Sequence, residues 1–319
     1  MTTLQPTQSR GIGLIFPGQG SQSVGMGKAL AEAYPGIRSV YDEASLVLGY
    51  DIAALCFEGP VERLNLTEYT QPALLVSSIA ALHAFKPLGI TSLAVAGHSL
   101  GEYSALVAAG GMTYPEAVAI VQKRGRYMAE AVLPGTGLVT ALLGLTADVV
   151  REVCRDASSV GVVAPANFNS PGQIVIAGEK AAVERAIELA KAKGCKKAII
   201  LPVSVPVHTP LMQKAADRLA GDLAAITWSD LKVPLITNAE ARALTKAGDI
   251  QASLIRQLPS SVLWEDSVKA MAAMGVTTFV EVGPGTVLSG LIKRILPDAV
   301  TMNVYDPKSL EATRAALSA

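Results

Sequence analysis

Short apolar runs that alternate with helical stretches organise the first third of the chain. Gly11 to Phe16 is an apolar run typical of a buried strand, followed by a Gly-rich turn and a helical stretch from about Gly27 to Tyr34. The same order returns where the apolar run Leu93 to Ala96 turns into a helical stretch from Ser99 to Ala109, which two glycines end. Strands that alternate with helices in this way predict a parallel sheet.

The middle of the chain has a different order of elements. Its pattern predicts strand, helix, strand, strand, helix and strand at residues 138–143, 147–157, 160–167, 173–177, 181–192 and 197–203. This βαββαβ order is that of a ferredoxin-like unit, and Pro- and Gly-rich stretches border it. We therefore expect an α/β fold with a small domain of residues 135–204 inserted into a large domain of residues 1–134 and 205–319. Further strands at 234–237 and 278–282 would complete the large parallel sheet.

Composition narrows the class of protein. Half of the 319 residues are hydrophobic and 17% are charged, which indicates a compact protein with a sizeable core. The formal net charge is zero and the pI is near 6.8, so no broad basic surface is available for nucleic acid or an anionic membrane. Met1 to Arg10 is polar, and no run of about 18 apolar residues follows. We expect a cytoplasmic monomer that does not enter a membrane.

Neither a metal site nor a nucleotide site is expected. Cys56, Cys154 and Cys195 are an odd number of cysteines without metal-ligand spacing, which predicts reduced thiols. The Gly-rich stretch from Gly25 to Ala29 departs from a phosphate-binding loop, which needs Gly where Gln22 stands and Ser or Thr at its last position.

A candidate nucleophile lies at the second strand-to-helix turn. Gly97-His98-Ser99-Leu100-Gly101 matches the Gly-x-Ser-x-Gly elbow, and an apolar strand precedes it while a helix follows it. Two glycines allow a tight reversal that would expose the Ser99 hydroxyl, and the start of the helix would stabilise a developing oxyanion. The alternative is a tight turn with an incidental serine.

A serine nucleophile needs a base, and the chain has His83, His98 and His208. His83 lies in an apolar helical run, so we expect it at the edge of the core. His98 is next to Ser99 but points along a different direction of the elbow, so we expect it to support the site rather than to act as the base. His208 lies before a predicted helix with Thr209 as N-cap and Pro210 as first residue, and a helix N-terminus would keep its imidazole neutral. A surface-loop histidine is the alternative, but the elbow serine favours His208 as general base.

Arg124 falls on the apolar face of a predicted helix from Tyr114 to about Val132. The i, i+3 and i+4 spacing puts Arg124 on the same face of this helix as five apolar residues, Ala117, Ile120, Val121, Met128 and Ala131. A buried guanidinium needs an anion, and a carboxylate is its best partner. The pattern leaves two interpretations open: an internal Asp or Glu neutralises Arg124, or a substrate carboxylate does.

The ordered set of motifs resembles the malonyl-CoA:acyl carrier protein transacylase family, which includes acyltransferase domains of polyketide synthases, over essentially the whole chain. The resemblance rests on Phe16-Pro17-Gly18-Gln19-Gly20-Ser21-Gln22, Gly97-His98-Ser99-Leu100-Gly101-Glu102, Gln122-Lys123-Arg124-Gly125, Asn167-Phe168-Asn169-Ser170-Pro171-Gly172-Gln173, Val203-Ser204-Val205-Pro206-Val207-His208 and Glu281-Val282-Gly283-Pro284-Gly285.

The resemblance implies roles for the candidate residues. Ser99 would be the nucleophile, His208 the base, and Arg124 the group that binds the free malonyl carboxylate. The fold it implies is an α/β-hydrolase-like large domain with a ferredoxin-like insert, in agreement with the pattern. No tightly bound cofactor or metal is implied, since the coenzyme A thioester is a substrate.

Further site residues follow from the same resemblance. The main-chain N–H groups of Gln19 and Leu100 would form the oxyanion hole, and the carbonyl of Gln257 would orient the histidine where hydrolases use a carboxylate. Val207 stands where many family members have Ser, which bears on the acyl group that is accepted. A basic surface for the acidic carrier protein would include Lys196, Lys197, Lys293 and Arg294, with ordinary solvated charge as the alternative.

The activity expected from these residues is ping-pong transfer of a malonyl group from malonyl-CoA, through an acyl-serine, to the phosphopantetheine thiol of acyl carrier protein in fatty acid biosynthesis. Three alternatives stay open: the malonyl transferase of a malonate decarboxylase system, a serine esterase, and a non-catalytic acyl-binding protein on the same fold.

Overall fold

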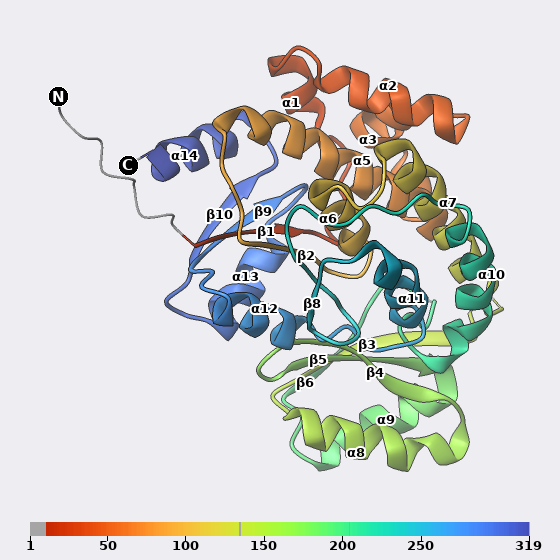
Figure 1. Cartoon of the computed structure of the whole chain (residues 1–319). Coiled ribbons are helices and arrows are strands. Elements are labelled where there is room, and N and C mark those ends of the chain that lie inside the picture. The colour runs from red at the N-terminus through yellow and green to blue at the C-terminus, as the bar shows by residue number, and fades with distance from the viewer. Residues whose placement is uncertain (1–10, 134, 204, 319) are drawn as a thin grey trace.

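A computed structural model describes residues 11–133, 135–203 and 205–318 (Figure 1). In chain order these residues form β1 (Ile12–Phe16), α1 (Lys28–Ala33), α2 (Ile37–Leu48), α3 (Ile52–Glu58), α4 (Val61–Leu64), α5 (Thr67–Phe85), η1 (Lys86–Leu88), β2 (Ala94–Gly97), α6 (Gly101–Ala109), α7 (Tyr114–Glu130), β3 (Gly137–Leu143), α8 (Ala147–Ala157), η2 (Ser158–Val160), β4 (Val163–Ser170), β5 (Gln173–Glu179), α9 (Lys180–Ala192), β6 (Lys197–Ile200), η3 (Pro210–Met212), α10 (Gln213–Leu223), β7 (Leu235–Ile236), β8 (Ala243–Leu244), α11 (Ala247–Gln257), α12 (Trp264–Ala273), β9 (Thr278–Val282), α13 (Val287–Ile295), β10 (Val300–Val304) and α14 (Pro307–Ser318).

The larger sheet is parallel apart from one edge. Its strand order is β10-β9-β1-β2-β7-β8, and only β8 pairs antiparallel, with β7, among the strands of this sheet. Strands β1, β2 and β9 are buried along their whole length because helices cover both faces of the sheet. The predicted parallel sheet is confirmed.

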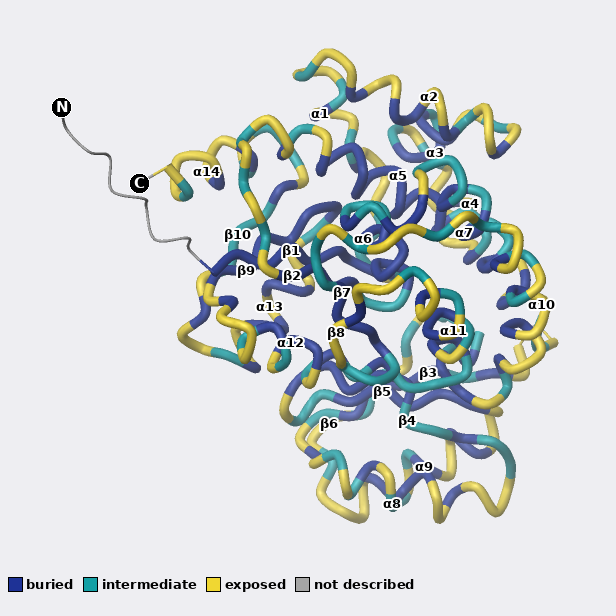
Figure 2. The backbone as a smooth tube through the Cα atoms, in the orientation of Figure 1, coloured by how far each residue is buried: buried dark blue, intermediate teal, exposed yellow. Residues whose placement is uncertain are grey.

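Two apolar cores lie on opposite faces of this sheet. Consecutive strand residues point to opposite faces, so Leu14 packs in the core beneath α2, α5 and α7, whereas Ile15 packs in the core with α12 and α13. Figure 2 shows the central strands of the large sheet as buried, with exposed residues mainly on the outer surfaces of the helices and on the loops.

The smaller sheet is antiparallel, with strand order β4-β5-β3-β6. Helices α8 and α9 cover its outer face, at the bottom of Figure 1. This order is that of a ferredoxin-like unit, so the predicted mixed fold class is confirmed. The predicted domain boundaries fall at residues 134 and 204, which lie outside the described residues, and the division into domains stays a prediction.

A loop of the large part joins the two sheets. The Val262 N–H donates to the carbonyl of Ala166 on β4 at 2.8 Å, and the Phe168 N–H donates back to the carbonyl of Val262 at 2.9 Å. Next to them, the Ser261 hydroxyl donates to the carbonyl of Pro165 at 2.6 Å. These bonds hold β4 beside the carboxyl ends of β1 and β2, where polar side chains of both parts meet.

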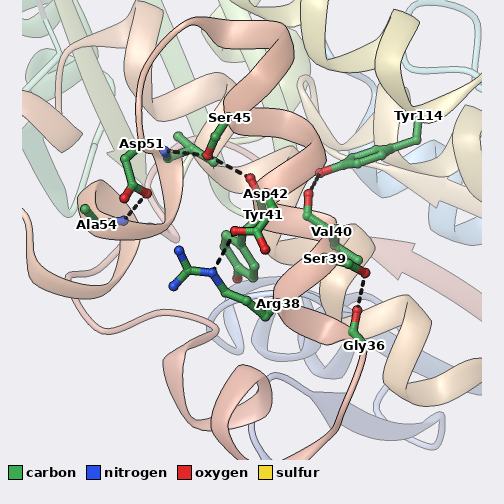
Figure 3. A network of polar contacts seen from close by, with 11 residues as sticks. Gly36, Arg38, Ser39, Val40, Tyr41, Asp42, Ser45, Asp51, Ala54 and Tyr114 are labelled. Carbon is green, nitrogen blue, oxygen red and sulfur yellow. Dashed lines mark hydrogen bonds and ion pairs between the residues drawn. The ribbon is translucent and has the colours of Figure 1, made fainter.

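Polar contacts around α2 fix the helices that cover the large sheet (Figure 3). The Tyr114 hydroxyl, at the start of α7, donates to the carbonyl of Val40 on α2 at 2.8 Å. Ser45 links α2 to α3, because its hydroxyl accepts the N–H of Ile52 at 3.1 Å. Asp51 then caps α3 by accepting the N–H of Ala54. The beginning of α7 is thereby anchored, which matters because α7 carries Arg124.

Several predicted element boundaries differ from the structure. The elbow helix begins at Gly101 rather than Ser99, and β4 runs from Val163 to Ser170 rather than from 160 to 167. The helix predicted from Pro210 begins as a 3-10 turn, and the α-helix itself starts at Gln213. None of the helices within the three described ranges is both long and apolar enough to cross a bilayer.

Candidate active site

Ser99 lies in a sharp elbow between β2 and α6. Its φ is +53°, a left-handed conformation that non-Gly residues rarely adopt. A Cβ at Gly97 would come 1.9 Å from the carbonyl carbon of Gly101, and a Cβ at Gly101 would come 2.1 Å from the carbonyl oxygen of Phe16. Both glycines of the motif are therefore required by close backbone packing, and the packing holds Ser99 in its strained conformation.

His208 contacts the serine directly. Its Nε2 lies 2.6 Å from the Ser99 Oγ, and its Nδ1 lies 3.1 Å from the carbonyl oxygen of Gln257 and 3.2 Å from that of Ser260. Carbonyl oxygens only accept, so Nδ1 carries the hydrogen and Nε2 is left free to accept the serine proton. No carboxylate of the described residues is hydrogen-bonded to this imidazole.

The charge state of His208 has a different cause from the one predicted. Burial, and then the positive charge of Arg124, lower the pKa of His208 to about 3. Thr209 does not act as a side-chain cap: its hydroxyl donates to the carbonyl of Pro206, and a 3-10 turn follows it. The imidazole is thus neutral at physiological pH, and Thr209 does occupy the N-cap position before Pro210, as predicted, although its side chain makes no cap hydrogen bond.

Arg124 is fully buried beside the nucleophile. Its guanidinium donates to the Oε1 of Gln71 at 2.8 Å, to the Oε1 of Gln257 at 3.0 Å and to the Ser99 Oγ at 3.1 Å. Every one of these acceptors is neutral, and no Asp or Glu in the described part of the chain lies within ion-pair distance. The Nε atom is buried without a hydrogen-bond partner among the same residues. An internal ion pair, one of the two interpretations above, is therefore absent there.

Two main-chain N–H groups near the nucleophile have no acceptor among the described residues. Among the described residues, the main-chain N–H groups of Gln19 and Leu100 donate no hydrogen bond. Gly18 brings the first of them close, because a Cβ there would lie 2.3 Å from the carbonyl oxygen of His98. The sequence placed both residues at this site, and the structure brings both to the elbow.

A cavity of about 90 Å³ opens onto Ser99 and His208. The small sheet contributes Val139 and Asn167 to its wall, and the segment that follows β6 contributes Leu201 and Val203. A larger groove of about 560 Å³ shares Gln19 and Val203 with this cavity, so the two hollows adjoin at these residues. The reactive atoms thus lie beside a groove large enough to hold part of a ligand.

Three polar residues of the site were not identified from the sequence. Asn238 accepts the Ser99 N–H through Oδ1 at 2.6 Å and donates from Nδ2 to the carbonyl of Gly97 at 2.7 Å. Glu102 and Gln71 are buried partners of Gln257 and Arg124, respectively. Of these three residues, only Glu102 could have been noticed in the sequence, because it is the one charged residue of the helix α6.

The other two histidines lie apart from the proton path. The Nε2 of His98 donates to the Oδ1 of Asn169 at 2.9 Å, and its ring centroid lies 5.6 Å from that of Trp264. This contact joins the elbow to β4, in keeping with the predicted supporting role. His83 is on α5 and makes no contact with the site.

Comparison with known proteins decides the family. The acyl transferase domain family matches residues 14–307. The chain belongs to this acyl transferase family. The malonyl CoA-acyl carrier protein transacylase of Escherichia coli (strain K12) is 48% identical over 299 residues, which are 93% of this chain and 97% of that protein.

Solved structures of the acyl transferase family agree with this assignment. An acyl carrier protein S-malonyltransferase from Vibrio cholerae has 48% identity and a TM-score of 0.93, covering 95% of this chain and 99% of that one. A malonyl-transacylase in complex with a type II PKS acyl-carrier protein has 44% identity and a TM-score of 0.94, covering 96% and 99%.

The four basic residues of this acyl transferase lie outside the active site. Leu143 of β3 pairs with Gln173 on one side and with Lys197 on the other, and Arg294 donates to the Gln173 side chain. Lys196 is next to Lys197 and packs its stem against Gly144. Lys293 instead donates to the carbonyl of Ala299. Lys196, Lys197 and Arg294 therefore lie together at one end of the small sheet and form what we call the basic edge, while the Lys293 ammonium is already engaged.

No cluster of His, Cys, Asp and Glu that could bind a metal ion is present in the described ranges. The groups that surround the elbow of this acyl transferase are a neutral imidazole, a guanidinium, amides and main-chain N–H groups. Such groups can support proton transfer and oxyanion stabilisation.

Proposed function

We propose that this protein transfers the malonyl group of malonyl-CoA, by way of an ester on Ser99, to the phosphopantetheine thiol of an acyl carrier protein in fatty acid biosynthesis. The observation that carries the proposal is the buried Arg124, which donates to the nucleophile and has only neutral partners among the described residues. Such a cation beside the reacting atoms suits an acyl group that ends in a carboxylate.

The first half-reaction acylates the serine. His208 Nε2 takes the Ser99 proton while Oγ attacks the thioester carbonyl, and the N–H groups of Gln19 and Leu100 stabilise the oxyanion. The carbon–sulfur bond then breaks, and the imidazolium returns the proton to the sulfur so that the coenzyme leaves as a thiol. The malonyl carboxylate is about 2.5 Å from the reacting carbon, two C–C bonds away, so binding to Arg124 holds that carbon near Oγ.

The second half-reaction reverses these roles. His208 takes the proton of the carrier's thiol, the sulfur attacks the ester carbonyl, and collapse of the tetrahedral species breaks the bond to Oγ. The proton then returns to Ser99. Neither half-reaction calls for a tightly bound cofactor, and we propose that the protein acts as a cytoplasmic monomer, with residues 135–204 as its small domain.

Within the described residues no carboxylate is hydrogen-bonded to His208, which separates this proposal from an ordinary serine esterase. The carbonyl oxygens of Gln257 and Ser260 accept the Nδ1 hydrogen instead. An esterase mechanism would also leave Arg124 without a role, and a non-catalytic binding protein would not require an Oγ–Nε2 distance of 2.6 Å.

Transfer to a carrier tests the proposed function. We expect the protein to form a malonyl adduct with malonyl-CoA and then to pass it to a holo acyl carrier protein of fatty acid synthesis, as measured by the intact masses of both proteins. An apo carrier without its phosphopantetheine arm is the control. Release of free malonate without transfer would support the esterase, and transfer only to the carrier of a malonate decarboxylase would support that system.

We expect reversal of charge at the basic edge to weaken carrier binding. The double variant Lys196→Glu, Lys197→Glu raises the KM for the carrier protein by about tenfold at low salt, because complementary surface charge mainly speeds encounter. Hydrolysis of malonyl-CoA in the absence of carrier stays unchanged. Lys308→Glu, an exposed lysine on α14, is the matched control. An unaltered KM in the double variant would mean that these lysines are ordinary solvated charges.

The low pKa of His208 predicts an unusual pH profile. Because burial and Arg124 lower this pKa to about 3, the neutral base persists as the pH falls below the ordinary histidine value of 6.5. We expect kcat/KM for acylation to show no inflection near pH 6.5 and to fall only as the pH approaches about 3. Stopped-flow acylation with malonyl-CoA at several pH values checks this, and an acid limb centred near pH 6.5 would contradict it.

A further inference from the structure

Glu102 is a fully buried carboxylate one hydrogen bond away from the malonyl-binding groups. Its Oε2 accepts the Gln257 side-chain N–H at 2.9 Å and the main-chain N–H of Asn238 at 3.0 Å. Its Oε1 is buried and has no hydrogen-bond partner in the described part of the chain. The proposed mechanism gives this residue no proton to move.

The Gln257 side chain can adopt only one orientation in this setting. Its Nε2 lies 2.9 Å from both the Glu102 Oε2 and the carbonyl oxygen of Ser99, which are acceptors, while its Oε1 lies 3.0 Å from the Arg124 Nη2, a donor. Exchange of the amide oxygen and nitrogen would set acceptor against acceptor on one side and donor against donor on the other. The Glu102 carboxylate and the Ser99 carbonyl oxygen therefore act together to turn the amide oxygen toward the guanidinium, and only Glu102 does so through a side chain that can be varied.

The position of Glu102 also leaves the cation available. A carboxylate in direct contact with Arg124 would neutralise it and compete with a substrate carboxylate. Gln257 stands between the two groups, so Glu102 fixes the guanidinium through an amide without occupying its remaining donors. Arg124 keeps its Nε–H unpaired among the described residues, so this donor of the guanidinium is not committed to a protein acceptor.

We propose that Glu102 is a positioning residue for selectivity: through the Gln257 amide it holds Arg124 in the geometry that binds a carboxylated acyl group. The inference rests on the proposed function, because it concerns the preference of the same site for malonyl over acetyl thioesters. It assigns Glu102 no contact with the substrate.

The experiment compares acylation of wild type, Glu102→Ala, Glu102→Asp and Glu102→Gln by malonyl-CoA and acetyl-CoA, with kcat/KM obtained for each thioester. Loss of an outer partner of a metal ligand changes activity about 10–100-fold, and we expect a similar scale here. Glu102→Ala should lower the malonyl-to-acetyl ratio at least tenfold. Glu102→Asp, whose carboxylate is one methylene short of Gln257, should do the same.

Glu102→Gln separates geometry from charge. Its carbonyl oxygen can take the place of Oε2, and its amide nitrogen the place of the unpartnered Oε1, so we expect the ratio to stay within about threefold of wild type. Glu281 offers a matched control, because it is also a fully buried carboxylate, accepting the N–H groups of Leu288 and Ser289 at 3.0 and 2.8 Å in a different part of the fold. Glu281→Ala should lower stability without changing the ratio.

The outcomes distinguish the inference from the function on which it rests. If wild type forms no malonyl adduct, the proposed function fails. If wild type prefers malonyl-CoA and both Glu102→Ala and Glu102→Asp keep that preference, or lose activity toward both thioesters equally, the positioning role is wrong. Should Glu102→Ala be insoluble, the Asp and Gln variants decide the question by the same ratio.

Discussion

We expect Ser99→Ala to abolish the malonyl adduct and to reduce turnover roughly 10⁶-fold, the scale seen when a serine nucleophile is removed. The reason is geometric as well as chemical. Ser99 Oγ is the hydroxyl that His208 Nε2 contacts at 2.6 Å and to which Arg124 donates. Intact-protein mass after brief exposure to malonyl-CoA measures the adduct, and a coupled assay of coenzyme A release measures turnover.

Ser104→Ala is the matched control for this variant. Ser104 is a buried serine on α6, the helix that follows the elbow, and its hydroxyl has no hydrogen-bond partner among the described residues. Its replacement should leave the adduct in place. An adduct that persists in Ser99→Ala would identify another nucleophile and overturn the mechanism.

The second large effect is expected at Arg124. Arg124→Ala should lower kcat/KM for malonyl-CoA by about 10²–10³-fold, since removal of the partner of a buried charge costs about 2–5 kcal/mol. The malonyl group would then present its carboxylate to a site with no cation. An acetyl group has no such carboxylate, so its acylation should fall much less and the preference for malonyl-CoA should disappear. Competition between the two thioesters, with the adducts separated by mass, gives the preference directly.

Arg126→Ala provides the control for loss of an arginine from the same helix. Its side chain is half exposed and lies at the outer groove, 4.0 Å from Glu130. The malonyl preference should be unchanged in this variant. Equal losses for malonyl-CoA and acetyl-CoA in Arg124→Ala would show that the guanidinium supports Ser99 rather than the carboxylate.

The elements that the sequence predicted well are those with local signals. The apolar runs of β1, β2 and β9 and the Gly-x-Ser-x-Gly elbow depend on residues that are neighbours in the chain, and the structure has them where the pattern placed them. Burial of Arg124 could likewise be predicted, because its place on the apolar stripe of α7 follows from helical spacing.

Other features depend on contacts between distant segments. Asn238 binds the Ser99 N–H across 139 positions, and Glu102 meets Gln257 across 155. Helical and strand periodicities relate only residues that are close in the chain, so they do not indicate contacts of this kind. The pattern therefore could not assign Asn238 or Glu102 to the site. The cause of the low His208 pKa was missed for the same reason: it is the approach of Arg124, together with burial, that lowers it, and the sequence offered only a local helix start.

The cavity beside Ser99 draws its parts from two separate sheets. The chemical groups come from the large sheet and its helices, whereas Val139, Leu201 and Val203 come from the small sheet or the segment after it. The space available to the acyl group can therefore be redesigned on β3 and after β6 while the nucleophile, base and guanidinium keep their supports. Protein engineers who want a different extender unit can begin at Val139, because β3 carries neither the nucleophile, the base nor the guanidinium.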